Sequence, residues 1–249
     1  MPCWPGDGHP HGLADEMQLS RLAPCLLSVL LLFIAPLLGC SDTASTSADS
    51  PQSEQIERGK HLLAASRYPE AIAVFQDQIE RTPSVAQLHS LLANAFAADE
   101  RLIEAVAAYQ QCLELNPTLG DARVELAILL TRLDRQPEAE QELQTAITHD
   151  PALARAHRIL GRVHYREARY DEAVEAYQRA IDSNPDFGRA WGDLGQAEIR
   201  RGNLAAAADA YRQASTTDPT NADFRDGLGF VLFKLRDYDA AATELEGAI

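Results

Sequence analysis

The sequence has few aromatic residues and no cysteine pairs that could hold a metal. Phe, Trp and Tyr make up only 6% of its 249 residues. This argues against a β-sheet core, because strands favour aromatic and β-branched side chains. None of the four cysteines forms a Cys-x-x-Cys pair or joins a Cys/His cluster, so neither a zinc module nor a disulfide framework is indicated. They are Cys3, Cys25, Cys40 and Cys112.

Basic residues are also scarce. The chain has 22 Lys and Arg residues against 37 Asp and Glu residues, which gives a formal net charge of -15. Nucleic-acid binding depends on Lys and Arg side chains that contact phosphates, so no nucleic-acid partner is expected. Apolar residues make up 46% of the chain, which is enough for a packed core, and abundant alanine favours helices.

One apolar run without a charged residue follows Arg21 and extends from Leu22 to Leu38. A basic start, an apolar middle and a small residue before the cut are features of a secretory signal peptide. The run ends in Leu37-Leu38-Gly39-Cys40, which resembles the lipobox of bacterial lipoproteins. The resemblance implies cleavage before Cys40, a diacylglycerol on its sulfur, and an acyl chain such as palmitate on its new amino group.

An uncleaved membrane anchor is the alternative for this run. The run is at the short limit for a membrane span, and Pro24 and Pro36 interrupt it. Residues 1–16 differ from the usual start of a signal, whereas Met17 begins an ordinary one, so a start at Met17 stays open. We therefore expect a signal peptide at 1–39, then an acylated cysteine and a flexible Ser/Thr-rich tether at 40–51.

A period of 34 residues fills the rest of the chain. Prolines recur at this spacing, and they define repeats at 52–85, 86–119, 120–153, 154–187, 188–221 and 222–249. Position 20 of every repeat is alanine, and position 8 is glycine or alanine. Position 24 is large in every repeat: Phe75, Tyr109, Leu143, Tyr177, Tyr211 and Leu245.

This pattern resembles the tetratricopeptide repeat. The resemblance implies an all-α fold, a right-handed superhelical solenoid of about six helix–turn–helix repeats with a concave groove. Small residues at positions 8 and 20 would let the two helices of a unit cross closely, and the large residue at 24 would fill the space between units. Proline at position 32 would end the second helix. The sixth repeat stops short of full length, so truncation, a covering molecule and fraying stay open.

No catalytic constellation is visible, so we expect neither an enzyme nor a cofactor. His157 and His164 lie seven residues apart on one helix face, as two metal ligands could. No acidic or cysteine ligand at matching spacing completes such a site. We therefore expect no metal and two partly exposed histidines, and we expect Cys112 to be buried.

The resemblance implies that the first helix of each repeat lines the groove. Arginines of repeat 4 then lie on one stripe, because they are three or four residues apart. They would either pair with Asp121, Glu125 and Asp193 of neighbouring repeats or receive carboxylates from a peptide or an acidic segment of a partner. The candidate groove residues are Arg155, Arg158, Arg162, Tyr165, Arg166, Arg189, Gln196, Arg200, Phe230 and Phe233.

The sequence thus predicts a lipid-anchored scaffold that binds a protein or peptide and helps to assemble a cell-envelope complex. A lipid anchor followed by repeats is similar in layout to the pilotins of type IV pilus secretins. The expected location is the bacterial envelope, facing the periplasm, and Ser41 favours the outer over the inner membrane. Two alternatives stay open: the non-catalytic repeat region of a truncated transferase, and a self-associating structural module.

The lipobox makes a direct prediction about the mature protein. Intact-mass spectrometry of the protein from bacterial membranes should show a chain that begins at Cys40 and carries acyl chains. Cys40→Ser should abolish the added mass and release the protein from the membrane, because the acyl chains provide the anchoring free energy. A mature wild-type chain that retains residues before 40, or an unmodified Cys40, would contradict the prediction.

Overall fold

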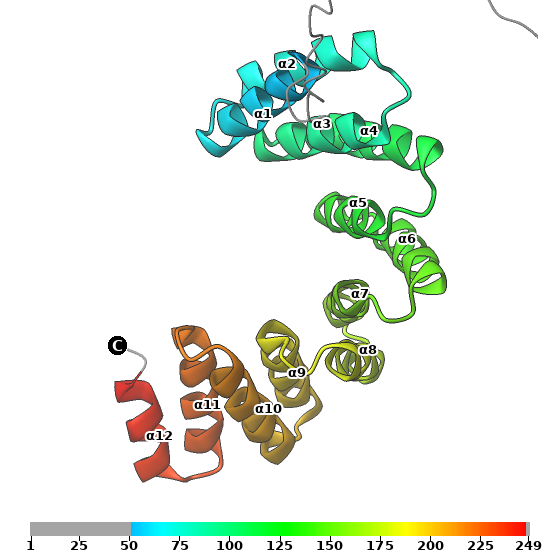
Figure 1. The fold of residues 1–249 in the computed structure, drawn as a ribbon. Helices are drawn as coiled ribbons and strands as arrows, with labels where there is room; N and C mark the ends of the chain where they lie inside the picture. Colours follow the sequence, from blue (N-terminus) through cyan, green and yellow to red (C-terminus); the bar gives the residue numbers. More distant parts are fainter. Residues whose placement is uncertain (1–50, 248–249) are drawn as a thin grey trace, which may run out of the picture. The chain divides into compact units, whose positions relative to one another are not determined.

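The computed structural model describes residues 51–247, which form twelve helices and no strand (Figure 1), so the all-α prediction is confirmed. None of these helices has the length and apolar character of a membrane span. Cys40, the predicted signal and the tether up to residue 50 lie outside the described residues. The helices are α1 Pro51–Ala64, α2 Tyr68–Arg81, α3 Ala86–Ala98, α4 Leu102–Leu115, α5 Gly120–Arg132, α6 Gln136–His149, α7 Ala154–Arg166, α8 Tyr170–Ser183, α9 Gly188–Arg201, α10 Leu204–Thr217, α11 Ala222–Lys234 and α12 Tyr238–Glu246.

The helices form six pairs that stack in sequence order. Each helix contacts its partner and the next helix along the chain. First helices also contact one another across pairs, as in α5 with α7, α7 with α9 and α9 with α11, whereas second helices make no comparable contact in the described part. The first helices therefore lie on the inner side of the stack, as Figure 1 shows. The tether prediction is wrong for Pro51, which begins α1, where a proline costs little.

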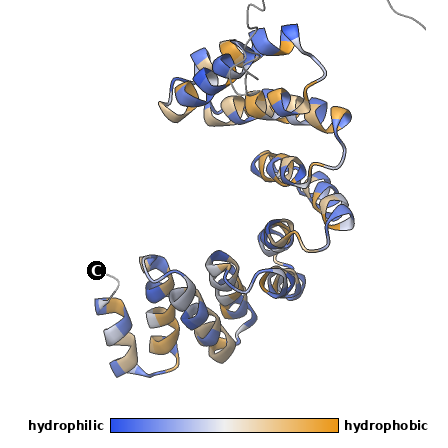
Figure 2. Cartoon of the chain, viewed as in Figure 1, coloured by the Kyte–Doolittle hydropathy of each residue, from blue (hydrophilic) through white to orange (hydrophobic). Residues whose placement is uncertain are grey.

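The two helices of a pair cross closely at position 8. A Cβ atom at Gly161 would lie 2.6 Å from Cε1 of Tyr177, so the tyrosine ring rests on the glycine of its own pair. Tyr211 packs in the same way on Gly195, and its other edge lies against Gly227 of the next pair. The large residue at position 24 therefore packs within its pair as well as between pairs. Every helix carries both hydrophobic and hydrophilic residues (Figure 2), as packing on a limited set of faces requires.

The turn inside each pair has a left-handed residue at position 15. After the end of α7, the N–H of Arg169 donates to the carbonyl of His164 at 2.9 Å, which is the hydrogen bond of a Schellman motif. Only one of the six turns uses glycine at position 15, although this conformation costs other residues roughly 1 kcal/mol or more. The residues with positive φ are Ser66, Glu100, Asp134, Ala168, Gly202 and Arg236.

This difference between turns can be tested with a reciprocal pair of substitutions. Ala168→Gly should raise the free energy of unfolding by about 1 kcal/mol, and Gly202→Ala should lower it by about the same amount. No atom lies within 4 Å of a Cβ at Gly202, so a clash would not contribute. Urea denaturation followed by circular dichroism measures both values. Changes of the same sign would contradict the prediction.

Candidate functional site

The arginines of α7 lie on a face shared by the neighbouring first helices. Arg155 forms an ion pair with Glu125 of α5, and its guanidinium lies 3.8 Å from Asp121. Arg158 donates through Nε to Oδ2 of Asp193 in α9 at 2.7 Å. These two arginines tie α7 to the pairs on both sides, and they form the ion pairs expected under the structural interpretation of the sequence.

The fourth arginine of this face is also used within the stack. Arg166 donates to the carbonyl oxygen of Thr131 at 2.9 Å and to Oδ1 of Asp134 at 3.0 Å. Both acceptors belong to the preceding repeat, and the side chain of Arg166 is 46% exposed. Arg166 therefore joins the third and fourth pairs at the end of α7 while its guanidinium remains accessible.

Two further arginines influence the charge of Asp193 without pairing with it. Arg162 and Arg189 are exposed, and neither forms a hydrogen bond or an ion pair with any described residue. Burial raises the pKa of Asp193, although Arg158, Arg162 and Arg189 act in the opposite direction. Asp193 is half-buried and pairs with Arg158 alone, so Arg162 and Arg189 remain without an ion-pair partner among the described residues.

Aromatic rings hold the remaining arginine of the predicted groove. The guanidinium of Arg200 lies over the ring of Tyr170, 4.7 Å from its centroid, and 5.8 Å from the centroid of Tyr165. The two tyrosine rings meet edge to face, with centroids 5.4 Å apart. Arg200 therefore has a cation–π environment in place of a carboxylate partner. Gln196, one turn before it, is exposed.

The predicted aromatic residues of α11 form a separate surface. Phe230 and Phe233 are 47% and 56% exposed. Lys234 lies 5.4 Å from the ring centroid of Phe230, and Phe233 packs edge to face against Tyr238 at 5.5 Å. Their ring contacts stay within the sixth pair, so the structure does not join them to the arginines of α7.

A small hollow between α5 and α7 contains residues that the sequence analysis missed. It measures about 70 Å³ and is lined by Ile128, Thr131, Arg132, Ile159, Arg162, Val163 and Arg166. Ile128 and Thr131 occupy positions 9 and 12 of repeat 3, which the family pattern assigns to the groove, so aligning that repeat could have found them. Val163 is at position 10, and no sequence signal marks it.

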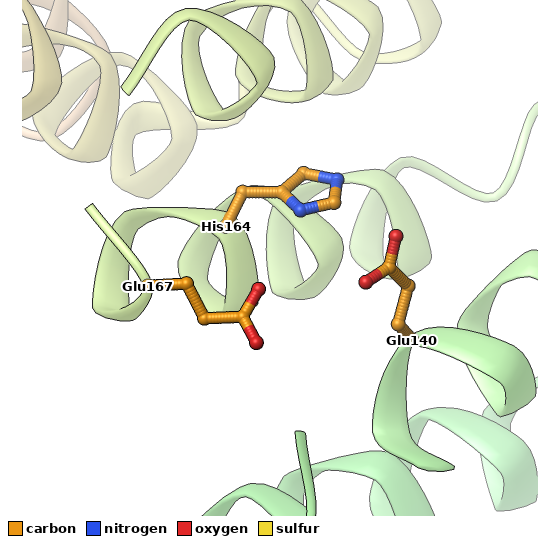
Figure 3. A group of neighbouring side chains, drawn as sticks. All are labelled: Glu140, His164 and Glu167. Carbon is orange, nitrogen blue, oxygen red and sulfur yellow. The ribbon is translucent and has the colours of Figure 1, made fainter. Parts of the chain in front are cut away.

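A polar cluster lies at the junction of the third and fourth pairs. Ligand-type atoms of Glu140, His164 and Glu167 lie within 4.8 Å of one another, and Figure 3 shows the side chains. Nη2 of Arg169 lies 2.7 Å from an oxygen of Glu140 and 2.7 Å from an oxygen of Glu167. Its guanidinium therefore supplies the positive charge that a metal ion would provide between the two carboxylates. The cluster therefore serves as an ion-pair junction between α6 and the end of α7.

The expectation that the α7 histidines are partly exposed is wrong. His157 is 5% exposed and His164 is 7% exposed. Nε2 of His157 lies 2.9 Å from the carbonyl oxygen of Pro151, while Nδ1 of His164 has no hydrogen-bond partner among the described residues. Burial and the nearby Arg169 lower the pKa of His164, which favours its neutral ring.

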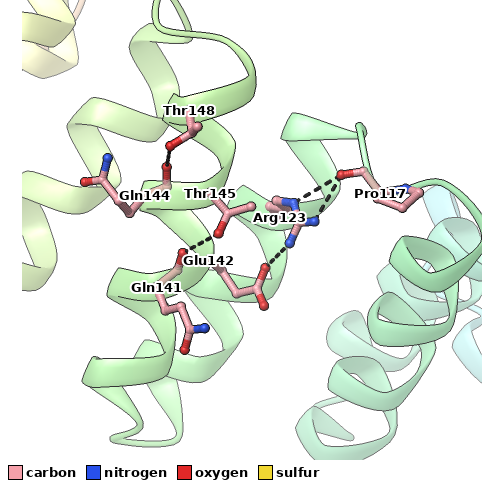
Figure 4. A network of polar contacts seen from close by, with 7 residues as sticks. All are labelled: Pro117, Arg123, Gln141, Glu142, Gln144, Thr145 and Thr148. Carbon is pink, nitrogen blue, oxygen red and sulfur yellow. Dashed lines mark hydrogen bonds and ion pairs between the residues drawn. The ribbon is translucent and has the colours of Figure 1, made fainter.

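Polar groups elsewhere in the stack have partners inside it. Arg123 of α5 donates to the carbonyl of Pro117 and pairs with Glu142 of α6 at 2.5 Å (Figure 4). Its side chain is 13% exposed. Thr145 and Thr148 donate to carbonyls of their own helix.

Cys112 is fully buried, as expected, and burial raises the pKa of its thiol.

Sequence profiles of the tetratricopeptide repeat match residues 56–120, 124–186 and 160–222, and a second such profile matches 198–249. The chain belongs to the tetratricopeptide repeat family. Proteins with this repeat are in general scaffolds for protein interactions. No curated protein sequence matches the chain.

Solved structures of tetratricopeptide repeat proteins share the fold. PilF from Pseudomonas aeruginosa is 20% identical with a TM-score of 0.68, covering 78% of this chain and 88% of that one. PilW, described as a widely conserved type IV pilus biogenesis factor, is 17% identical with the same TM-score, covering 78% and 90%. YrrB, described as having an unusual peptide-binding site, is 22% identical with a TM-score of 0.54, covering 70% and 90%.

The buried histidine of the polar cluster predicts a pH dependence of stability. An unfolded histidine has a pKa of about 6.5, and the folded pKa of His164 is lower, so acid favours the unfolded chain. The contribution of His164 is complete above about pH 6.5 and is lost as the pH falls towards the folded pKa. Between about pH 7.5 and pH 5, wild type should therefore lose more free energy of unfolding than His164→Asn.

Urea titrations at the two pH values measure this difference, and His149→Asn, at an exposed histidine of α6, is the matched control. The control should lose as much stability as wild type. A larger acid loss in His164→Asn than in wild type would show that the sign is wrong.

Proposed function

We propose that this protein is a non-catalytic scaffold that binds an acidic segment of a protein or peptide partner on the face formed by its first helices. The observation that carries this proposal is that Arg162 and Arg189 are exposed and unpaired, whereas Arg158 of the same face pairs with Asp193. A partner carboxylate at Arg162 and Arg189 would supply the missing charge. Arginine suits this role, because its planar guanidinium can form two parallel hydrogen bonds to a carboxylate.

The charge of the rest of the chain gives this surface its selectivity. The protein carries a formal net charge of -15, so an acidic partner is repelled by most of its surface. A local excess of guanidinium groups then favours approach in one orientation. Tyr165 and Tyr170 lie beside the site with Arg200 over their rings, so they add apolar contact area for the same ligand.

We also propose that the scaffold is anchored through acylated Cys40 in the bacterial envelope, faces the periplasm, and helps to assemble an envelope complex. The lipobox-like sequence before Cys40 supports the anchor, and Ser41 favours the outer membrane. The similarity in fold to PilF and PilW supports an assembly role of the kind that the description of PilW names. In this proposal the protein has no reaction and no cofactor of its own.

The arginine site predicts a specific loss of binding. Arg162→Glu combined with Arg189→Glu should weaken binding of a fluorescein-labelled, glutamate-rich peptide by at least about tenfold, since two favourable charge contacts become repulsive. Fluorescence anisotropy with the full chain measures the dissociation constant. The thermal unfolding curve should stay close to that of wild type, because neither arginine forms an ion pair in the stack.

Arg179→Glu combined with Arg212→Glu is the control, because these exposed arginines lie on the second helices α8 and α10 and the net charge changes equally. It should change the affinity by less than the test pair. Equal losses in both double variants would reject the site, and concentration-dependent self-association without peptide binding would favour the structural module.

A further inference from the structure

The hollow between α5 and α7 combines an apolar floor with a cationic rim. Ile159 is 4% exposed and Val163 is fully buried, so both belong to the packed core and form a fixed surface. The half-buried Ile128 contributes from α5. An apolar ligand group of matching size would displace water here and bury surface on both sides.

The rim has one guanidinium that the stack does not use. Arg132 pairs with Glu100, and Arg166 is bonded to Asp134 and to the carbonyl of Thr131. Arg162 lines the same hollow without an ion pair and also influences Asp193. A carboxylate bound at Arg162 would therefore lie beside the entrance to the hollow.

This arrangement suits a ligand that presents a carboxylate and an aliphatic group close together. In an extended peptide, side chains two residues apart point to the same side and are separated by about 7 Å. An acidic residue two positions from a leucine, isoleucine or valine meets this requirement. The hollow is small and its floor is apolar, so it suits one branched aliphatic side chain better than a bulky indole.

We propose that the hollow is a selectivity pocket for an aliphatic side chain in an acidic peptide segment, with the pattern acidic–x–aliphatic. This inference rests on the proposed function and specifies its ligand. Arg162 binds the carboxylate, and Ile128 and Ile159 contact the aliphatic side chain, with Val163 packed behind them. The arginines alone would accept any acidic segment, whereas the hollow distinguishes among segments of equal charge.

The test uses labelled peptides with the core Glu-Gly-X-Gly-Glu, in which X is leucine, alanine or tryptophan and the charge is constant. Anisotropy titrations with the full chain should show that the leucine peptide binds about tenfold more tightly than the alanine peptide, since its larger side chain buries additional methylene-sized groups. The tryptophan peptide should bind less tightly than the leucine peptide, because a bulky indole matches the small hollow less well.

A filling substitution tests the location. Thr131→Leu places a larger side chain in the hollow and removes only a hydrogen bond to the carbonyl of Ala127 in the same helix. It should reduce the leucine-to-alanine preference to about onefold. Thr145→Leu is the matched control, because Thr145 is also half-buried, bonds to a carbonyl of its own helix, and lies outside the hollow. It should keep the preference.

The outcomes separate the two proposals. If the leucine and alanine peptides bind wild type equally and both lose affinity in the Arg162→Glu, Arg189→Glu variant, the pocket is rejected and the arginine site stands. Tighter binding of the tryptophan peptide than of the leucine peptide, or a preference that survives Thr131→Leu, also rejects the pocket. If no acidic peptide binds, both proposals fail.

Discussion

The close crossing of the two helices in each pair is the constraint on which the stack depends. At Gly161 the absence of a side chain lets the ring of Tyr177 rest directly on the helix backbone, and Tyr211 packs on Gly195 in the same way. Because protein interiors are close-packed, any larger residue at this position forces the ring or the helix to move. The small residue at position 8 and the large one at position 24 therefore fix the geometry of a pair together, and repetition of that pair fixes the stack.

This geometry decides which arginines are structural and which are available. With α7 in contact with both α5 and α9, side chains one turn apart on its face meet different neighbours. Arg155 reaches Glu125 on one side and Arg158 reaches Asp193 on the other. Arg162, one turn further, meets the hollow and no carboxylate of its own. The same periodicity that builds the fold thus leaves Arg162 of α7 without an ion pair among the described residues.

The sequence predicts the fold well, because every repeat has small and large residues at the same positions and proline recurs at a fixed spacing. A repeat that departs from the pattern at one position is still recognised from its agreement with the other repeats. The sequence predicts the site less well, because ion pairs depend on which acidic side chain of a neighbouring pair comes within reach. His164 is buried where its ring lies close to Glu140 of the preceding repeat, and the family pattern does not mark that position. The left-handed residue of each turn is also hard to predict from the sequence. Gly202 is the only glycine among the six described turn residues, and the other five are residue types that do not signal a positive φ.

Burial separates the structural role of an arginine from a binding role. Arg123 and Arg158 each expose 13% of their side chains, so removing the carboxylate partner of either would leave a nearly buried charge unpaired and destabilise the stack. Arg162 and Arg189 are exposed, and exposed charges contribute only about 0–1 kcal/mol even when paired. Like charges on neighbouring turns of α7 repel each other, whereas the charges of Arg162 and Arg189 favour the ionised form of Asp193. Under the proposed function, an anionic ligand would supply the ion-pair partner that these two exposed arginines lack among the described residues.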